Sequence, residues 1–598
     1  MYLTPEEKKV GQENFLAAVG SRHVRRSKDK AASRDFLLGG IQKGIASRKG
    51  LGSYYYGYES SVKEPVRVGV IGTGDEGSVL IGAINPEFIE VRSIADIRPY
   101  SIFRAFHGEV GVSVRPGLLS VYRWESEEAA RKKVKVYGPW QELIANAKQD
   151  GLEAVIIALP LHLHAPAAVA AMKAGLHVLT EKLMAHDVAQ CKDMARVAKQ
   201  TNRYLATGHQ RHYNILYHHA VELIRSGLIG DIHYIAAQWH RGNLPGRDSW
   251  KQPLPPGVKS LAEDPHAEVL VRDLKDFEAT LAKAKEDLAK AKDDKKADAE
   301  KLIKATEARI KQKQAQIEDK IVQAEKHDYQ SKQYKDVAGR LIYNRPAIEE
   351  LVRWRLWDRT GGGLMAELGS HQLDAASIFI SAMHGGQKQH PLSVAAAANR
   401  PIFPPDRDIE DHVFCIFEFP APGYDPKDPH ANLKRIGVQY SSINGNGFGE
   451  YGETVYGTSG TLILQREQEA LLYRVAATND KTRVSSKRIK DQEGKEKVVS
   501  SLDVAEAGDE ESSAVGRLAL WGAKRGYEEQ LEHWAWCIRN PAPENQPRCP
   551  PKVALGDAVI ALTANLAARQ GKRIDFDEAW FDPDSDKTPD GSKPSVPA

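Results

Sequence analysis

Cysteine is scarce in this sequence of 598 residues: only Cys191, Cys415, Cys537 and Cys549 occur, far apart from one another. Their number and spacing exclude a disulfide framework and a cysteine-based zinc site, and they are typical of a reducing compartment. Long apolar runs are also missing, since none reaches the roughly 18 residues that a transmembrane helix needs. These absences predict a cytoplasmic protein without a membrane span.

An excess of charge of either sign is absent as well. Lysine and arginine total 83, aspartate and glutamate total 80, and the formal net charge is +3. This balance gives no attraction to nucleic acid or to an acidic membrane surface, so we expect neither as a partner. A chain of 598 residues with 41% hydrophobic and 27% charged residues is globular in composition. It exceeds what one hydrophobic core supports, so we expect at least two domains.

Residues 1–60 form an extension that precedes the first regular pattern. Within it, residues 33–37 resemble the core of a twin-arginine export signal that lacks one arginine. A working signal continues with an uninterrupted apolar stretch, which three basic residues break here, Lys43, Arg48 and Lys49. We therefore interpret the extension as a decayed leader, with export as the alternative. The aromatic run at residues 54–58 is expected to anchor it against the folded body.

Strand and helix patterns alternate over residues 61–205. Short apolar strands are predicted at Val66–Ile71, Ile89–Ala95, Ala154–Leu159 and His177–Thr180. Strands that alternate with helices of this length indicate an α/β domain with a parallel, doubly wound sheet, the Rossmann arrangement. Residues 107–123 have no place in this pattern and are expected to be a surface insertion.

A second domain is predicted over residues 206–580. Its candidate strands, Ile232–Trp239, Val413–Phe419 and Ile436–Ser442, are longer and have no regular helices between them, as in an antiparallel sheet. We expect an α+β domain with an open, mainly antiparallel sheet. Residues 581–598 are polar and contain proline, which predicts a disordered tail.

A coiled-coil hairpin is predicted to interrupt this domain at residues 262–330. Apolar residues recur at spacings of four and three along a first helix: Leu270, Leu274, Phe277, Leu281, Ala284, Leu288 and Ala291. A second seam follows a charged loop: Ile303, Thr306, Ile310, Ile317, Ile321 and Ala324. Two such helices in series pair as an antiparallel hairpin. The hairpin is either an oligomerisation or docking arm or a tolerated insertion with a solvated surface.

A glycine motif, Gly72-x-Gly74-x-x-Gly77, follows the first predicted strand and precedes a helix. The first glycine permits a tight turn, the second lets a pyrophosphate approach the backbone, and the third lets the helix pack on the strand. Asp96 ends the second strand, where a carboxylate binds ribose hydroxyls and repels a 2′-phosphate. The pattern predicts NAD as the cofactor. Arg98 could accommodate a phosphate and keeps NADP as the alternative.

Two further segments carry chemistry. Glu181 and Lys182 end a later Rossmann strand, where an ammonium can stabilise a substrate alkoxide; the alternative is an ordinary surface ion pair. Glu367 and His371 lie four residues apart after three glycines and are expected to share one helix face. A histidine can take a proton from an alcohol and return it. No third ligand accompanies the pair, so we expect no metal ion; the alternative is a buried histidine satisfied by Glu367.

The segment Trp239–Asn243, with Arg247 and Trp250, offers aromatic rings and hydrogen-bond donors. Rings and donors of this kind suit a sugar, which presents both apolar C–H faces and hydroxyl groups. The same residues equally suit the root of the helical hairpin, and the sequence favours neither role.

Several of these motifs, in this order, resemble the glucose–fructose oxidoreductase/inositol dehydrogenase (Gfo/Idh/MocA) family. Pro160 to Ala165 resembles its T-P-N-x-x-H stretch, and Ala174 to Lys182 resembles its GKHVLCEKP segment. Ile229 to Ile232 resembles its IGxI turn, and Gly361 to Asp374 its GGG…D-x-G-x-H-x-x-D segment. The resemblance covers most of residues 66–250 and 350–570. It implies an NAD-binding Rossmann domain and a second domain whose sheet supports the substrate site and contacts within a homo-oligomer.

The resemblance also implies roles for single residues. Lys182 becomes the active-site lysine, His371 the proton acceptor, and Glu367 the carboxylate that orients substrate and histidine. Pro160, His162 and Glu181 join Gly72, Gly74, Gly77 and Asp96 in the cofactor site, although His162 could instead cap the helix that follows it. Three positions depart from the family pattern: Glu367 replaces aspartate, Leu183 replaces proline, and Leu161 replaces asparagine.

The sequence thus predicts an NAD-dependent oxidoreductase that acts on a secondary hydroxyl of a sugar, polyol or related compound. One alternative is an NAD-dependent glycosidase, in which transient oxidation acidifies a neighbouring C–H and permits elimination. Another is a non-catalytic NAD-binding sensor, against which Lys182 and His371 argue. The expected partners are the carbohydrate or polyol substrate and further copies of the chain, through the second sheet and the hairpin.

Overall fold

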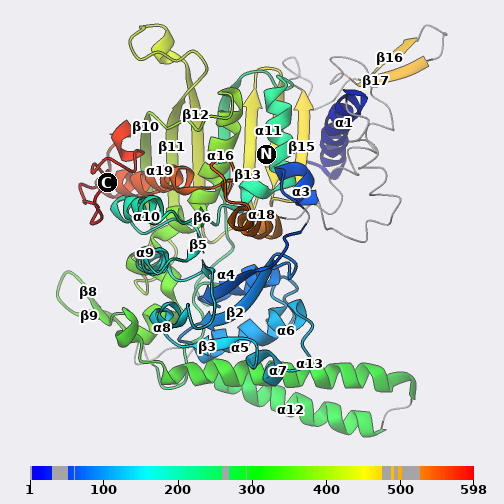
Figure 1. Cartoon of the computed structure of the whole chain (residues 1–598), viewed down its shortest axis with the longest axis vertical. Helices are drawn as coiled ribbons and strands as arrows, with labels where there is room; N and C mark the ends of the chain where they lie inside the picture. The colour runs from blue at the N-terminus through cyan, green and yellow to red at the C-terminus, as the bar shows by residue number, and fades with distance from the viewer. Residues whose placement is uncertain are drawn as a thin grey trace.

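The computed structural model describes residues 3–29, 51–59, 61–258, 268–290, 293–474, 486–490, 496–500 and 525–598. Two sheets lie one above the other, and a long helical hairpin runs beneath the lower one (Figure 1). Within the described ranges, no helix is long and apolar enough to cross a bilayer. The segment that resembles a twin-arginine signal, residues 33–37, lies outside the described residues.

The lower sheet has six strands in the order β3-β2-β1-β4-β5-β6. They are β1 (Val66–Ile71), β2 (Ile89–Ala95), β3 (Lys135–Tyr137), β4 (Ala154–Ile157), β5 (His177–Thr180) and β6 (Leu205–Thr207). All neighbouring strands are parallel. This is the strand order of a Rossmann fold, with its crevice between β1 and β4, and it confirms the predicted fold of the first domain.

Helices cover both faces of the Rossmann sheet. They include α4 (Asp75–Gly82), α5 (Pro99–His107), α8 (Trp140–Asn146), α9 (His164–Lys173) and α10 (Val188–Thr201). One covering helix comes from far along the chain: α18 (Tyr527–Arg539) contacts β1 and β2. Its Leu531 and Trp534 are fully buried in one cluster with Val66, Val68 and Ile89. The Rossmann core is therefore completed by a helix that follows most strands of the second sheet in sequence.

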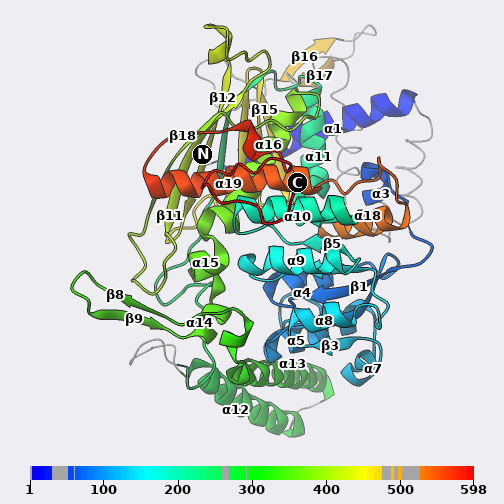
Figure 2. The ribbon, with the colours of Figure 1, turned by 60° about the vertical axis from the view of Figure 1, so that its left-hand side comes forward.

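The upper sheet has eight strands in the order β15-β14-β13-β7-β12-β11-β10-β18. They are β7 (Ile232–Trp239), β10 (Ser393–Asn399), β11 (His412–Pro420), β12 (Arg435–Ile443), β13 (Tyr451–Gly457), β14 (Gly460–Gln465), β15 (Glu469–Arg474) and β18 (Ile574–Asp575). Only the β7–β12 pair is parallel, so the expected open, mainly antiparallel sheet is confirmed. Helices α11 (Ile215–Arg225), α16 (Ser370–Met383) and α19 (Pro551–Gln570) lie on one face (Figure 2).

The extension packs onto the body. Helix α1 (Pro5–Asp29) lies beside β15, where Asn14 Nδ2 donates a buried hydrogen bond of 3.0 Å to the Leu472 carbonyl. Helix α3 (Leu51–Tyr56) contacts α18, and the Tyr58 hydroxyl beyond it donates to Glu532 Oε2 at 2.6 Å. The aromatic run therefore anchors the extension, as its composition suggested.

The polar tail differs from the sequence-based expectation of disorder. It runs along α10, whose Lys192 Nζ donates to the carbonyls of Ala579, Ser585 and Lys587 at 2.7–2.9 Å. Arg196 donates to the carbonyls of Pro583, Ser585 and Val596 at 2.7–3.0 Å. The prediction of disorder from low hydrophobicity was wrong for this segment. Two basic side chains of the neighbouring helix bind the backbone of the tail and hold it in place.

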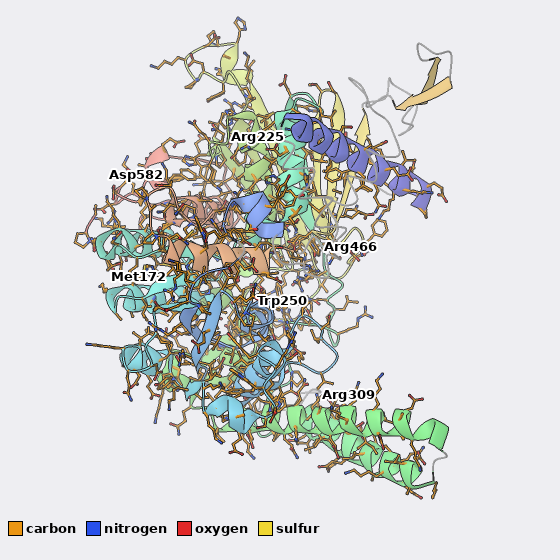
Figure 3. The ribbon with its side chains drawn as sticks, turned by 45° about the vertical axis from the view of Figure 1, so that its right-hand side comes forward. Met172, Arg225, Trp250, Arg309, Arg466 and Asp582 are labelled. Carbon is orange, nitrogen blue, oxygen red and sulfur yellow. The ribbon has the colours of Figure 1, made fainter. Side chains whose placement is uncertain are left out.

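The hairpin consists of α12 (Val269–Lys290) and α13 (Asp293–Glu318). Ion pairs between Asp273 and Lys313, at 2.8 Å, and between Lys285 and Glu307, at 3.0 Å, fix the helices as antiparallel. Helix α13 packs against α5 of the Rossmann domain, and Figure 3 shows Arg309 on it, at the end of the molecule opposite the second sheet. The hairpin interrupts the second domain in sequence but packs against the Rossmann domain.

Candidate active site

A cleft opens at the carboxyl ends of β1, β2, β4 and β5. Its walls include residues 72, 74–76 and 95–98 from the Rossmann domain, residues 326–329 that follow the hairpin, and residues 354, 355, 361, 366 and 367 from the second domain. Its volume, with the solvent at its mouth, is about 1350 Å³. Gly72, Gly74, Asp96, Pro160, Glu181, Lys182 and Glu367 all line it. The structure thus brings most of the predicted site residues together.

The glycine turn fits a pyrophosphate. Gly72 has a φ of +82°, and a Cβ there would lie 2.5 Å from the Ala158 carbonyl oxygen. A Cβ on Gly77 would lie 2.0 Å from the Gly72 oxygen, whereas at Gly74 the nearest atom is 3.8 Å away. Helix α4 begins directly after this open position, and no side chain caps its first N–H groups. Space and free donors therefore coincide at a helix N-terminus, as anion binding requires.

Asp75 places a carboxylate at this turn, which alone would repel a phosphate. Its oxygens are paired with Arg104 Nη1 at 2.8 Å and with Arg355 Nη1 at 3.0 Å. Burial opposes ionisation, but the two guanidinium groups outweigh it and hold the pKa of Asp75 below its usual range. The acidic charge at the turn is therefore compensated within the protein.

Asp96 is oriented by backbone donors at the end of β2. Its Oδ2 accepts from Thr73 N at 2.8 Å and its Oδ1 from Arg98 N at 2.9 Å. Burial raises the pKa of this carboxyl, and the two N–H donors act in the opposite direction. A carboxylate fixed in this way beside the glycine turn is suited to accept hydrogen bonds from ribose hydroxyls.

Lys182 is held by Glu367 across the domain boundary. Its Nζ donates to the Glu367 carbonyl at 2.9 Å and lies 3.6 Å from Glu367 Oε2. The other carboxylate oxygen of Glu367 accepts from Arg355 Nε at 2.7 Å. Burial raises the pKa of Glu367, but Lys182 and Arg355 lower it to about 2. The carboxylate is charged at neutral pH and fixes the ammonium at the cleft wall; the Lys182–Leu183 peptide is cis.

Two further carboxyl groups lie close to Lys182. Glu181 Oε2 accepts from the Lys182 backbone N–H at 3.1 Å, while its Oε1 is buried without a hydrogen-bond partner. Burial, and then the nearby Glu76, raise the pKa of Glu181 to about 8. Burial also raises the pKa of Glu76. The raised pKa favours the protonated form of Glu181, which can donate a hydrogen bond.

His371 lies on α16, just beyond the residues that line the cleft, and is 7% exposed. Its ring centroid is 5.6 Å from that of Trp239, and its Nδ1 is buried without a hydrogen-bond partner. Burial, followed by the charges of Lys182 and Arg211, holds the pKa of His371 well below its usual range. The imidazole is neutral at pH 7 and can accept a proton.

Glu367 and His371 do not form the pair expected from their spacing. The turn Met365–Gly369 before α16 is a π-helix, which changes the angle between residues four apart. Glu367 consequently bonds to Lys182 and Arg355, while His371 faces Trp239. His371 is therefore not satisfied by Glu367.

His162 is likewise turned away from the cleft, although its neighbours line it. Its ring packs edge-on against Tyr329 at 5.4 Å, and burial lowers its pKa to about 3. Both ring nitrogens are buried without a hydrogen-bond partner. His164 lines the cleft instead, and its ring nitrogens lie 2.9 and 2.8 Å from the carbonyls of Leu183 and Leu159.

Aromatic and cationic side chains gather beside His371. The ring of Trp239 stacks on Tyr451 at 4.3 Å between centroids. The guanidinium of Arg241 lies 5.8 Å from the Trp239 ring and 5.4 Å from the Trp250 ring. None of these four side chains is among the residues that line the cleft, so both interpretations of the segment remain predictions.

Several residues of the cleft were not identified from the sequence. Arg355 links Asp75 of the glycine turn to Glu367, and residues 326–329 contribute to the cleft wall. Arg355 carried one signal, a cation within the aromatic run Trp354–Trp357 shortly before the three glycines. Its partners are 12 and 280 residues away in sequence, so no local pattern could have assigned its role.

Two side-chain clusters outside the cleft have the proximity of metal ligands: His209, Asp374 and Asp557, and His212, Cys549 and Asp557. Both contain Asp557, whose carboxylate accepts a hydrogen bond from Lys388 Nζ. The lysine ammonium supplies the positive charge that the two buried carboxylates require.

Residues 66–209 match the sequence profile of a family described as "Oxidoreductase family, NAD-binding Rossmann fold". A glycosyl hydrolase family 109 protein of Solibacter usitatus is 26% identical over 219 residues, which cover 36% of this chain and 46% of that protein. An uncharacterized oxidoreductase of Streptococcus pneumoniae is 29% identical over 137 residues, 23% of this chain and 34% of that protein. The chain spans less than half the length of these curated relatives.

Among solved structures, the aldose-aldose oxidoreductase from Caulobacter crescentus, complexed with glycerol, is similar over 86% of this chain and 100% of that one. The sequence identity is 15% and the TM-score is 0.45.

Proposed function

We propose that this protein oxidises or reduces a secondary hydroxyl of a sugar, polyol or related compound. Its residues 66–209 match the Gfo/Idh/MocA oxidoreductase family, whose profile describes an NAD-binding Rossmann fold. The observation that carries the proposal is the position of Lys182. It ends a Rossmann strand on the wall of the cofactor cleft, fixed by a residue of the second domain. Bound NAD supplies the hydride acceptor or donor, and the protein supplies the groups that handle charge and protons.

Lys182 stabilises negative charge on the substrate oxygen. Its ammonium can donate a hydrogen bond to that oxygen while Glu367 and Arg355 keep the side chain in place. Because the site is buried, a fixed donor of this kind acts more strongly than it would in water. The stabilisation is greatest when the oxygen carries the charge of an alkoxide.

His371 is the proposed proton acceptor. Its depressed pKa keeps the imidazole neutral at pH 7, the form that accepts a proton, and also makes it a weaker base, so the transfer relies on Lys182 to lower the pKa of the substrate hydroxyl. A neutral imidazole takes the proton of the substrate hydroxyl during oxidation and returns it during reduction. The stacked Trp239 and Tyr451 and the guanidinium of Arg241 offer a C–H contact surface and donors for a polyhydroxy compound.

A second candidate function is favoured by the Solibacter usitatus relative and by another from Stenotrophomonas maltophilia, both named glycosyl hydrolase family 109 proteins. In an NAD-dependent glycosidase, transient oxidation acidifies the neighbouring C–H bond and permits elimination of the leaving group. Lys182 and His371 would perform the same charge and proton steps. The cofactor ends in its starting redox state, so the two functions differ in their products. A sensor without catalysis would not need Lys182 and His371 in these environments.

The decisive experiment follows absorbance at 340 nm with NAD across a panel of free sugars, polyols and glycosides, with product analysis of each mixture. NADH formation that depends on one free sugar or polyol supports the dehydrogenase. Cleavage of a glycoside without net NADH supports the glycosidase. Binding of NAD with neither product contradicts both.

Lys182→Ala is expected to lower kcat by roughly 100-fold or more, the typical loss for removal of one oxyanion donor. Because Lys182 acts on the substrate oxygen, the Kd for NAD should change by less than about threefold. The exposed Lys173→Ala on α9 is the matched control and should leave both quantities unchanged. Full activity of Lys182→Ala would contradict the role assigned to this residue.

A further inference from the structure

The hairpin ends where its chain contacts the cofactor domain. Helix α13 stops at Glu318, although the apolar seam continues to Ala324 in sequence. The next residue, Asp319, is 1% exposed and contacts Arg98 and Tyr100 at the start of α5. The chain therefore leaves its helix where it meets the Rossmann domain.

Both carboxylate oxygens of Asp319 are bonded there. Oδ2 accepts from Arg98 Nε at 2.9 Å and lies 2.8 Å from Arg98 Nη2, while Oδ1 accepts from the Tyr100 backbone N–H at 3.0 Å. Such a two-pronged pair fixes a guanidinium more firmly than a single contact does. The charge of Arg98 is therefore compensated by a residue more than 200 positions later in the chain.

Arg98 is the cation that matters for cofactor choice. It follows Asp96 by two residues, its backbone N–H binds the Asp96 carboxylate, and it lines the same cleft. An arginine in this position is the usual binder of the 2′-phosphate that distinguishes NADP from NAD. Here its donors Nε and Nη2 are turned toward Asp319 instead.

The neighbouring contacts hold Asp319 in place. Gln312, two turns earlier on α13, accepts from Val110 N at 3.2 Å and lies 3.3 Å from the Tyr100 hydroxyl. Beyond Asp319, Ala324 and Tyr329 pack in a small apolar cluster with Leu163 and Leu351. The segment then contributes residues 326–329 to the cleft wall. The insertion is thus built into the cofactor site.

We propose that Asp319 is a specificity-determining residue for the cofactor. It lies at the end of the hairpin and binds Arg98, and this contact makes the cleft select NAD over NADP. A 2′-phosphate would add roughly two negative charges next to Asp96 and Asp319. To bind Arg98, it would also have to displace the carboxylate of Asp319. A free 2′-hydroxyl meets no such barrier and binds Asp96. The inference rests on the proposed function only in that the cleft binds a dinucleotide.

The test is the ratio of the Kd values for NADP and NAD, measured by calorimetry on the full-length chain. Asp319→Asn keeps the size of the side chain and removes its charge. We expect NADP to bind at least tenfold more tightly relative to NAD, because Arg98 is freed. The double variant Asp319→Asn with Arg98→Met should restore the wild-type ratio. Asp273→Asn, which removes an ion pair within the hairpin, is the matched control and should not change the ratio.

A second variant keeps the proposal open to contradiction if Asp319→Asn does not fold. Asp319→Ser also removes the carboxylate that engages Arg98, so it too should shift the Kd ratio at least tenfold toward NADP; an unchanged ratio in folded Asp319→Ser would overturn the proposal. So would an unchanged Kd ratio in folded Asp319→Asn, or an equal loss of affinity for both cofactors. If the wild-type chain binds neither dinucleotide, the proposed function itself fails. Tight NAD binding with an unaltered ratio in Asp319→Asn defeats this inference alone.

Discussion

Charges at the cleft are compensated in sets. Asp75 is paired with Arg104 and Arg355, and Glu367 with Lys182 and Arg355. For the largely buried Glu367, removal of one partner leaves a poorly compensated carboxylate and costs about 3–5 kcal/mol. Arg355 belongs to both sets, so its loss would disturb the glycine turn and the lysine together. The activity of an Arg355 variant should therefore be compared with its free energy of unfolding, which separates a loss of stability from a loss of catalysis.

His371 predicts a pH dependence of stability. Its folded-state pKa lies well below the ordinary value of 6.5, so below pH 6.5 the unfolded chain binds a proton that the folded chain does not. The folded state is therefore destabilised as the pH falls. Between pH 7 and pH 5 one such histidine costs about 2 kcal/mol of the free energy of unfolding. His371→Asn should lose less stability over this range than the wild type in urea denaturation.

The control for this prediction is His430→Asn, which changes an exposed histidine and should leave the pH dependence as in the wild type. The same depressed pKa places the acid limb of kcat/KM below pH 6.5 for the wild-type enzyme. An identical pH dependence of stability in His371→Asn and wild type would contradict the assignment of a neutral, buried imidazole.

At the level of elements, α10 binds the polar tail through several side chains that differ in burial. Arg196 is buried, and its guanidinium donates to three tail carbonyls and to Asp586. Lys199, on the exposed side of the same helix, pairs with Asp584. Hydrogen bonds from buried charged groups contribute far more to stability than exposed ion pairs do. The two residues therefore form a natural comparison.

Arg196→Met should lower the free energy of unfolding by about 2–4 kcal/mol, because several charge-assisted hydrogen bonds are lost while the apolar stem is kept. It should also expose the tail to carboxypeptidase digestion. Lys199→Met, the control, should change stability by less than about 1 kcal/mol. Equal effects of the two variants, followed by denaturation and by mass spectrometry of the tail, would argue against this attachment.

Elements could be predicted from the sequence where their patterns are long and local. The strand β7 occurs at the predicted bounds, and Asp96 and Lys182 lie in the cleft because parallel strands end at one edge of a sheet. The strands β3 and β6 are only three residues long and leave no periodicity to recognise. The π-turn before His371 and the pairs of Arg355 and Asp319 depend on contacts between distant segments. No local pattern encodes such contacts.

At the scale of the whole molecule, one face of the second sheet exposes side chains of β11 among the described residues. On β11 the side chains alternate, with Phe414 and Ile416 exposed at 42% and 61% and the intervening Cys415 and Phe417 buried. The exposed pair faces Ala397 and Ala395 on the neighbouring β10. A cluster of four exposed apolar side chains on an open sheet is suited to contact a second copy of the chain.

We expect the protein to be a homo-oligomer through this face. Ile416→Glu should shift it to a smaller species in light scattering coupled to size exclusion, because a charge would be buried in the contact. Leu433→Glu, at an exposed apolar residue outside the strands, is the control and should not change the mass. A monomeric wild type would contradict the expectation.

The position of α18 has a consequence for the order in which the protein is made. Residues 61–207 contain all strands of the Rossmann sheet, but part of its core is closed by Leu531 and Trp534. A ribosome adds roughly 5–20 residues per second, so the sheet is synthesised well before its covering helix. During that interval the apolar surface that Leu531 and Trp534 cover in the folded chain lacks its partner helix. Completion of the cofactor domain is therefore a late event in synthesis, because most strands of the second sheet are made before α18.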